Sequence, residues 1–537
     1  MRKILAFTLF LQSGIAFCQT FTTSNLPIVV LNTGGAIIND EPKVEITMGI
    51  IDNPSGVNNV TDPWNGYNGA IGIEFRGNST QGFDKKTYSI ELHTSTGADT
   101  SVTLLGMPRE EDWILHAMVI DKTQLRMPMS FYLSQRMGHY ASRYRYVEVV
   151  LDGDYRGVYI LTEKLKRDKN RVDIAKLDSD DLAGDSLTGG YVLRIDWLDN
   201  PQGFESNMNA QGGNPMFFQW YYPKASNILP AQSAYIKGYM DVFEEALFSA
   251  TYINTVGIRY DHYIDLTSFV DFLLINEFSK NSDGYKLSSY LHKDKESKGG
   301  KLVAGPIWDF DQTYGLSTVC SSHDYTGWTY LQNQIDCEDL ESMPMWWQRF
   351  MSDTLFANHL ACRWQAMRQG PMHLDSITLW IDNQRAVMQT AIDRNFIKWQ
   401  FLGSQIWIEP FPIPQDYQEE IDYMKDWIAN RLVWLDANMP GNCQYDVIAS
   451  TYPLQSSVLA LQLYPNPMGD EAVIDFDNPH GKPFELHIYD MMGRESYVRK
   501  GIKKGRVQIS RGTMSAGLYV LQIKNGSEVG WIKLLVR

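Results

Sequence analysis

The stretch between residues 276 and 315 opens with NEFSKNSDGY (276–285) and ends in GPIWDFDQTYG (305–315). Between the two motifs, β-prone runs at 289–292 and 301–304 flank Lys298-Gly299-Gly300, which predicts a hairpin. A hairpin returns the chain to its starting point. We therefore expect Asp283 and Asp309 to lie close together.

Two neighbouring carboxylates are compatible with three interpretations. A divalent cation and a base, as phosphoryl transfer requires, can be built from them. The acid and base of a glycoside hydrolase use the same residue types. Asp residues that flank strands can also serve only to form turns. The residues of this stretch alone leave the three interpretations open.

The chain before this stretch is rich in predicted strands, and the chain after about residue 228 is mainly helical. Short alternating apolar runs predict strands at 27–31, 44–48, 71–75, 88–92, 147–151, 157–161 and 190–195. Apolar residues at helical spacing predict helices at 122–138, 235–248, 266–278, 346–367 and 421–435. This order predicts an α+β fold with a β-rich first part and an α-rich second part.

The two ends of the chain differ from its middle. Arg2 and Lys3 precede a mostly apolar run, which predicts a signal peptide over residues 1–18. Turn-forming and small residues predict a linker at 441–462, and short, evenly spaced strands predict a small β-sandwich at 463–537. Residues 19–440 are then expected to form the main domain.

The composition bears on which partners to expect. Lys and Arg number 48 against 63 Asp and Glu, a net charge of −15. Binding to nucleic acid by general electrostatics needs a basic surface, so we expect no nucleic-acid partner. No run after the signal segment is long and apolar enough to cross a bilayer, so we expect no transmembrane helix in the mature chain.

Four cysteines remain after the signal peptide: Cys320, Cys337, Cys362 and Cys443. An even number in an exported chain allows up to two disulfides. A bond between Cys320 and Cys337 would close one irregular loop and is the first pairing to expect. A buried free thiol is the alternative for each of the four.

Five short runs and one glutamate carry a family resemblance. They are FRGNST (75–80), KKTY (85–88), GDYRGVY (153–159) with Glu163, NSDGY (281–285) and WDFD (308–311). In this order the chain resembles the CotH family of spore-coat-protein-H-like kinases over roughly residues 27–440. The resemblance implies an atypical protein-kinase fold that uses Mg²⁺ and ATP. It also implies transfer of the ATP γ-phosphate to a hydroxyl of an acceptor protein that the sequence does not identify.

The resemblance further implies roles for single residues. Asp283 matches the catalytic-loop Asp, which orients and deprotonates the acceptor hydroxyl. Asp309 matches the metal-binding Asp of the kinase D-F-G motif, although the third residue here is Asp311, a further candidate metal ligand. Kinases typically carry Asn five residues after the catalytic Asp. This chain has Ser288 there, a shorter candidate ligand.

The resemblance also implies a phosphate-binding segment. Arg76 and the loop to Gly82 resemble the segment that covers the phosphates. Lys85 or Lys86 resembles the phosphate-binding Lys, with Glu163 as its ion-pair partner. If both lysines lie on a strand, they face opposite sides and only one can enter the site.

The C-terminal segment carries a second resemblance. Its runs are LYPNP (463–467), YDMMG (489–493), GLY (517–519) and the last residues 533–537. They resemble the C-terminal sorting domain of type IX secretion substrates in Bacteroidetes-type bacteria. The resemblance implies the type IX machinery as a partner and a secreted or outer-membrane cell-surface location. A carbohydrate-binding accessory sandwich is the alternative.

The sequence therefore predicts an exported CotH-like protein kinase. Two observations favour a rival prediction: ATP is scarce outside the cytoplasm, and Ser288 replaces the usual Asn. The rival is a non-catalytic surface protein that uses a kinase-like scaffold for adhesion or ligand binding.

Overall fold

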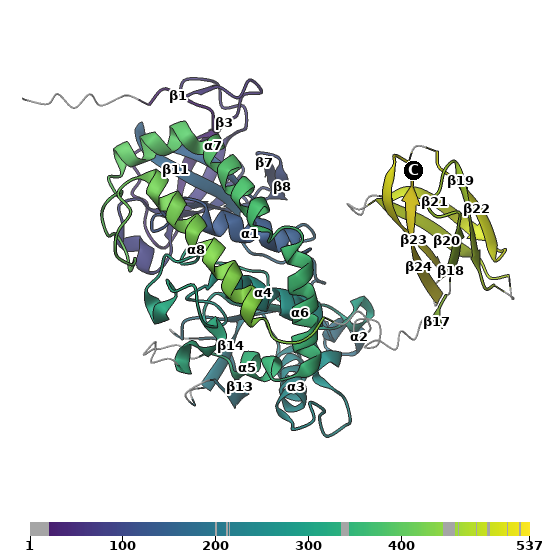
Figure 1. Ribbon diagram of the computed structural model, residues 1–537. Coiled ribbons are helices and arrows are strands. Elements are labelled where there is room, and N and C mark those ends of the chain that lie inside the picture. Colours follow the sequence, from purple (N-terminus) through teal and green to yellow (C-terminus); the bar gives the residue numbers. More distant parts are fainter. Residues whose placement is uncertain are drawn as a thin grey trace, which may run out of the picture. The chain divides into compact units, whose positions relative to one another are not determined.

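The structure is a computed structural model of the chain (Figure 1). It describes residues 21–198, 201–210, 213, 215–334, 343–443, 457–459, 461–478, 481–490, 495–512, 514–525 and 528–537. The chain divides into two compact units, residues 1–443 and 444–537. The signal peptide predicted for residues 1–18 lies outside the described residues. Across the described part of the chain, each helix is too short or too polar to cross a bilayer.

The first unit begins with a closed barrel of strands in the order β10-β11-β9-β6-β5-β3-β2. The strands are β2 (Ile28–Asn32), β3 (Val44–Ile51), β5 (Tyr67–Arg76), β6 (Thr87–His93), β9 (Asp112–His116), β10 (Tyr144–Leu151) and β11 (Asp154–Glu163). A parallel pair, β10 with β2, closes the barrel, and the other neighbours are antiparallel. Alternate residues such as Ile71, Ile73 and Ile90 fill its interior.

Smaller elements accompany the barrel. Two short ladders pair β1 (Thr23–Ser24) with β4 (Asn58–Asn59) and β7 (Val102–Leu104) with β8 (Met107–Glu110). A 3₁₀ turn, η1 (Ser79–Gly82), occupies the loop between β5 and β6. Helix α1 (Arg126–Arg136) connects β9 to β10 and covers part of the range predicted as helix. The β-rich first part is confirmed, and the barrel is its form.

The rest of the first unit combines one antiparallel sheet with helices. The sheet has the order β13-β14-β12-β15-β16, with β12 (Tyr191–Ile195), β13 (Gly203–Asn209), β14 (Pro215–Tyr222), β15 (Ser289–Lys293) and β16 (Leu302–Ala304). The helices are α2 (Gly184–Leu187), α3 (Pro230–Phe248), α4 (Leu266–Ser279), α5 (Met345–Met351), α6 (Thr354–Arg368), α7 (Leu374–Lys398) and α8 (Tyr417–Asn438). The 3₁₀ turns are η3 (Tyr260–His262), η4 (Glu296–Lys298), η5 (Val319–Ser321) and η6 (Thr329–Gln334). The predicted hairpin at 289–304 is confirmed by the β15–β16 pair.

The long helix α7 was not predicted, although it packs directly on the barrel (Figure 1). Its Asn395 accepts a hydrogen bond from the backbone N–H of Val158 in β11. A Cβ at Gly157, whose φ is +94°, would lie 2.4 Å from Asn395 Oδ1, so this glycine of the GDYRGVY run permits the close approach. Exposed apolar residues such as Leu379 and Ile397 obscure the helical spacing of the buried ones.

The predicted helix at 346–367 is in fact two helices, α5 and α6. Asp353 lies at the break, and its side chain accepts a hydrogen bond from the backbone N–H of Leu355 at the start of α6. Asp is a preferred N-cap residue because it satisfies a backbone N–H that the helix leaves unpaired. The helical spacing of apolar residues continues across the break, so the sequence pattern does not reveal that there are two helices.

The described disulfide joins Cys362 of α6 to Cys443. Cys320 is also disulfide-bonded, and Cys337, its predicted partner, lies outside the described residues. Cys443 lies beyond the predicted domain end at residue 440, within the predicted linker. The chain at Gly441 packs so closely on α6 that an added Cβ would lie 2.2 Å from the carbonyl oxygen of Ala357. Residues 441–443 therefore belong to the first unit.

The second unit is a β-sandwich, as predicted. Its sheets have the orders β17-β24-β23-β20-β21 and β18-β19-β22. The strands are β17 (Ser457–Val458), β18 (Leu461–Tyr464), β19 (Glu471–Phe476), β20 (Phe484–Asp490), β21 (Glu495–Ile502), β22 (Arg506–Ser510), β23 (Gly517–Asn525) and β24 (Glu528–Val536). Leu486, Ile474 and Leu521 are among its core residues. β17 and the start of β18 lie inside the range predicted as linker, which therefore extended too far.

We predict that replacing both Cys362 and Cys443 with Ser destabilises the first unit. The bond spans 81 residues of sequence. Releasing a loop of this size should lower the free energy of unfolding by about 4 kcal/mol. Urea denaturation of the full chain measures the change, and the separate unfolding transition of the sandwich is the internal control. An unchanged first transition would contradict the prediction.

Candidate active site

The loop that carries Asp283 is positioned by α4, a helix buried along almost its whole length. Asp265 caps its N-terminus by accepting a hydrogen bond from the backbone N–H of Ser268. Lys280, with φ of 47°, ends the helix in the left-handed conformation. Its ammonium donates to three backbone carbonyls, those of Ser321, Asp324 and Thr326, so Lys280 holds the chain that packs beside the loop.

A buried carboxylate fixes the end of α4. Glu277 accepts hydrogen bonds from the backbone N–H groups of Thr329 and Tyr330 at 2.7 and 2.9 Å, and from the hydroxyl of Tyr285 at 2.9 Å. Arg431 of α8 donates to the Glu277 backbone carbonyl at 2.9 and 2.6 Å. Burial raises the pKa of Glu277, while Arg431 and the backbone donors oppose the rise.

The turn after α4 is tightly packed. Asn276 in the last turn of α4 accepts a hydrogen bond from the Asn281 side chain, and Asn281 accepts one from the backbone N–H of Asp283 at 3.2 Å. A Cβ at Gly284 would lie 2.6 Å from Asn276 Oδ1, which explains a glycine after Asp283. The side chain of Asp283 accepts a hydrogen bond from Gln312 at 3.3 Å, so the two acidic motifs meet.

The β15–β16 hairpin brings Asp309 to Ser288. The Ser288 hydroxyl donates to Asp309 Oδ2 at 3.2 Å. Ser288 and Asp309 both adopt left-handed backbone conformations, with φ of 45° and 63°, and Tyr285 has φ of 71°. Such conformations are costly for residues other than glycine, and they gather at functional sites. The structure therefore joins Ser288 to Asp309, while Asp283 reaches the second acidic motif through Gln312.

Asp311 interacts electrostatically with both Asp309 and Asp283. Burial raises the pKa of Asp311 well above its usual value, and the negative charges of Asp309 and Asp283 raise it further. Burial also raises the pKa of Asp309; the charge of Asp196 adds to this, whereas the Ser288 hydrogen bond and Arg76 lower it. Such a concentration of negative charge favours the binding of a cation.

The basic side of this region contains Arg76, whose charge lowers the pKa of Asp309. Its guanidinium lies over the ring of Trp308, 5.9 Å from the centroid, next to Asp309 in sequence. Sequence reasoning missed two neighbours, Asp196 and His116. Burial lowers the pKa of His116 to about 3, and the positive charges of Arg76 and Lys85 add to the effect. His116 ends the strand β9, where no motif marked it.

The two lysines face different surroundings. Lys85 is buried, and its amine donates to the backbone carbonyls of Ala117 at 2.8 Å and Val158 at 2.7 Å. Burial lowers its pKa to about 7. Lys86 is partly exposed, and its ammonium donates to the carbonyl of Gln81 at 2.6 Å. Both lysines precede β6, which begins at Thr87, so strand alternation does not set their directions; of the two, Lys85 is the buried one.

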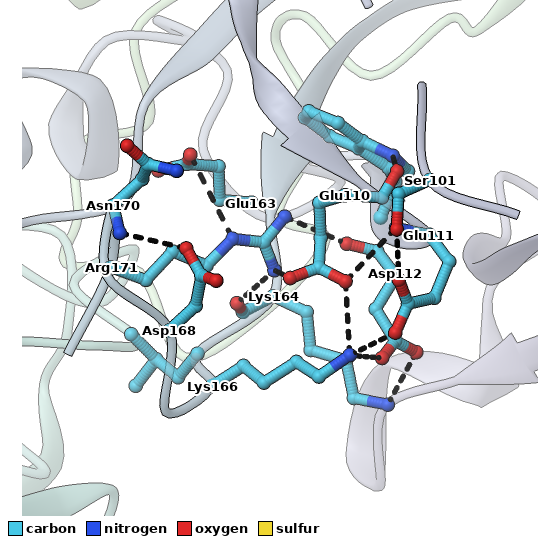
Figure 2. Close-up of polar contacts among 12 residues, drawn as sticks. Ser101, Glu110, Glu111, Asp112, Glu163, Lys164, Lys166, Asp168, Asn170 and Arg171 are labelled. Atoms are coloured by element: carbon cyan, nitrogen blue, oxygen red, sulfur yellow. Dashed lines mark hydrogen bonds and ion pairs between the residues drawn. The ribbon is translucent and has the colours of Figure 1, made fainter. Parts of the chain in front are cut away.

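Glu163 does not pair with either lysine. Figure 2 shows it beside Arg171, and its Oε1 lies 3.0 Å from Arg143 Nη2 and 3.8 Å from Arg171 Nε. It also accepts a hydrogen bond from Tyr140. The predicted Lys–Glu163 ion pair is therefore wrong, because Glu163 at the end of β11 is neutralised by the two arginines.

Oxygen ligands for a cation are present at Asp309, Ser288 and Asp311. Mg²⁺ prefers oxygen ligands and is commonly bound by one or two carboxylates together with substrate phosphates. These residues can supply the carboxylates. Over the described ranges, the groups of three His, Cys or acidic residues with ligand atoms within 4.8 Å of one another lie elsewhere, at Glu91–His93–Asp99 and Glu110–Glu111–Asp112. The aspartates of the site therefore do not form a preassembled three-acid cage.

Comparisons with known proteins give two matches. A family model described as CotH kinase protein matches residues 73–435, and one described as secretion system C-terminal sorting domain matches residues 462–537. No curated protein matches the chain. The second match shows a sorting tail for export to the cell surface or beyond, and it covers the sandwich described above.

We predict a pH-dependent stability that originates at Lys85. Its pKa of about 7 in the folded chain is below the unfolded value of 10.5. Between these values the unfolded state binds more protons, so stability increases as the pH rises through this window. From pH 7 to pH 9 the unfolding free energy of the first unit should increase by about 2 kcal/mol more in the natural chain than in Lys85→Met.

Urea denaturation at the two pH values measures this difference. Lys85→Met also loses the hydrogen bonds to the two carbonyls. This loss affects the variant equally at both pH values, so it cancels when the pH dependences of the two proteins are compared. Parallel pH dependence in the two proteins would contradict the prediction.

Proposed function

The chain belongs to the CotH kinase protein family, and from this we propose that it is an exported, Mg²⁺- and ATP-dependent protein kinase. The acceptor is a protein hydroxyl. The observation that carries the proposal is the meeting of Asp283, Asp309 and Asp311 beside Arg76. The N-terminal signal peptide and the sorting tail would together lead the chain out of the cell.

The acidic side of the site would hold the metal. Asp309 is held by Ser288 and lies near the charges of Asp196 and Arg76. In the proposal Asp309, with Ser288 and Asp311, binds Mg²⁺. When bound, the ion neutralises charge on the transferring phosphate. Burial and the charges of Asp309 and Asp283 raise the pKa of Asp311. A bound cation would relieve the repulsion among these three carboxylates.

Asp283 is the candidate that faces the acceptor. Its loop is fixed through Asn281 and Asn276, and its carboxylate contacts Gln312. A carboxylate held this rigidly can orient a hydroxyl and accept its proton, which is most of what phosphoryl transfer asks of a protein.

The basic side would meet the phosphates. Arg76 ends β5, immediately before the loop that closes at Lys85 and Lys86. Lys85 as a neutral amine has two N–H donors, and it uses them on the carbonyls of Ala117 and Val158. A phosphate nearby would favour the ammonium form, which carries a third donor. Lys85 would then bind phosphate without leaving its carbonyl partners.

Two observations favour the rival function. Lys85 contacts backbone carbonyls, and Ser288 stands where kinases typically carry Asn. The rival is a non-catalytic surface protein that binds a ligand or partner on the same scaffold. It differs from the proposal in requiring no Mg²⁺-dependent nucleotide binding.

We predict that Mg²⁺-ATP raises the melting temperature of the full chain. Ligand at a hundred times its Kd should add about 2.7 kcal/mol to the unfolding free energy. The shift should require Mg²⁺, disappear in Asp309→Ala and persist in Asp283→Ala, because of these two residues only Asp309 is assigned to the metal. Thermal unfolding with and without nucleotide measures it.

The two variants control for each other, since each removes one partly buried aspartate from the same region. Phosphate transfer to any acceptor found later should be lost in Asp283→Ala. If the natural chain is folded and millimolar ATP with Mg²⁺ does not raise its melting temperature, the kinase proposal is wrong and the non-catalytic surface protein remains.

A further inference from the structure

A polar cluster separate from Asp309 lies on the barrel strands β3 and β6 and on the loop after β6. We call Glu45, Glu91, His93 and Asp99 the His93 cluster. Residues flanking its members in sequence, such as Ile46, Ile90 and Leu92, fill the barrel core. Because side chains alternate along a strand, Glu45, Glu91 and His93 point away from that core.

The sheet register places the cluster over one glycine. Glu45 of β3 is opposite Gly72 of β5, and Gly72 is opposite Glu91 of β6. His93 follows Glu91 two residues later, on the same face. A Cβ at Gly72 would lie 2.9 Å from His93 Cε1, so the imidazole lies across the position that any other residue would fill. The missing side chain lets His93 reach from β6 toward Glu45 on β3.

The imidazole is enclosed and incompletely bonded. The His93 side chain is 10% exposed, and its Nδ1 lies 2.5 Å from Glu45 Oε1. Despite this distance, Nδ1 is a buried atom without a hydrogen bond of acceptable geometry. Nε2 lies 3.6 Å from Asp99 Oδ1, beyond a hydrogen bond. Nδ1 therefore faces Glu45, and Nε2 is the ring nitrogen left facing Asp99 without a hydrogen bond to it.

The spacing of the surrounding oxygens fits a bound ion. One ring nitrogen of His93 and one carboxylate oxygen each of Glu91 and Asp99 lie within 4.8 Å of one another. Lys43 neutralises part of the charge by donating to Glu91 Oε2 at 2.6 Å, and it lies 4.0 Å from Glu74. The other carboxylates around His93, those of Glu45 and Asp99, remain without a lysine or arginine ion pair among the described contacts.

The neighbouring acidic group provides a contrast. Glu110, Glu111 and Asp112 also bring three ligand atoms together. Figure 2 shows the Lys166 ammonium in their midst, and it contacts all three carboxylates. A lysine already fills the position that an ion would take there. In the His93 cluster Lys43 contacts Glu91 but is not paired with Asp99, and the third group is an imidazole, which can ligate a metal.

We propose that the His93 cluster binds a divalent first-row transition cation of the Zn²⁺ type. One His93 nitrogen, Glu91 and Asp99 are the ligands, since imidazole with carboxylates suits such ions. Glu45 holds the other ring nitrogen, the role that a carboxylate commonly has behind a metal-binding histidine. The ion would tie β3, β6 and the loop after β6 together, and so stabilise the barrel.

Zn²⁺ titration of the chelator-treated full chain, followed by calorimetry, tests this site. The natural chain should bind one equivalent more than His93→Ala. His373→Ala is the matched control, because His373 also lies beside an aspartate, 3.7 Å from Asp375, but outside the cluster. It should keep the natural stoichiometry. Differences between variants remain meaningful even where another histidine, such as His487, adds an equivalent of its own.

Three further variants locate the ligands. Asp99→Asn alters a side chain that is 67% exposed, so the chain should fold normally and lose the equivalent. Glu45→Gln should weaken Zn²⁺ binding by about 10- to 100-fold, as expected for a partner behind the ligand. Gly72→Ala should displace the His93 ring and abolish the same equivalent. Circular dichroism checks that each variant is folded.

Two results would overturn the proposal. One is an equal number of Zn²⁺ equivalents in the natural chain, His93→Ala and Asp99→Asn. The other is a site filled by Ca²⁺ and not by Zn²⁺, which would replace the transition-metal assignment with a carboxylate-only one. Both are independent of nucleotide binding.

Discussion

A single buried carboxylate, that of Glu277, supports the arrangement of the candidate site. It receives two backbone N–H groups, a tyrosine hydroxyl and Arg431 from the distant helix α8. Removing one partner of such a buried pair typically costs about 3–5 kcal/mol, because the other charge is left uncompensated. Burial lowers the pKa of Arg431 to about 10 even though the charge of Glu277 raises it, so each member depends on the other. The contact between Glu277 and Arg431 therefore positions the turn after α4, which carries Asp283.

The site itself joins three parts of the chain. The turn after α4 supplies Asp283, the segment after β16 supplies Asp309 and Asp311, and β5 with the loop that follows it supplies Arg76 and Lys85. Negative charge gathers on one side, where burial and mutual repulsion raise the pKa values of Asp309 and Asp311. Positive charge gathers on the other, where His116 stays neutral between Arg76 and Lys85. A metal-bound polyphosphate is the kind of ligand that satisfies both sides at once.

Local sequence patterns predicted much of the fold and of the candidate site. They failed for features that depend on contacts between residues far apart in the sequence. Alternation revealed most barrel strands, and the hairpin at 289–304 brought Asp283 toward Asp309. Barrel closure depends on the parallel pairing of β2 with β10, which no local pattern encodes. Glu163 was assigned to a lysine by resemblance, whereas Arg143 and Arg171 reach it in space. The helix break at Asp353 was hidden because apolar spacing alone does not register a cap.

The central claim is that Asp309 binds the metal of a nucleotide complex. Crystals grown with Mn²⁺ and a non-hydrolysable ATP analogue, measured at a wavelength where manganese scatters anomalously, test it most directly. We expect a manganese peak about 2 Å from an Asp309 carboxylate oxygen, with the terminal phosphates facing Arg76 and Asp283. Manganese or nucleotide bound elsewhere, with these residues empty, would contradict it.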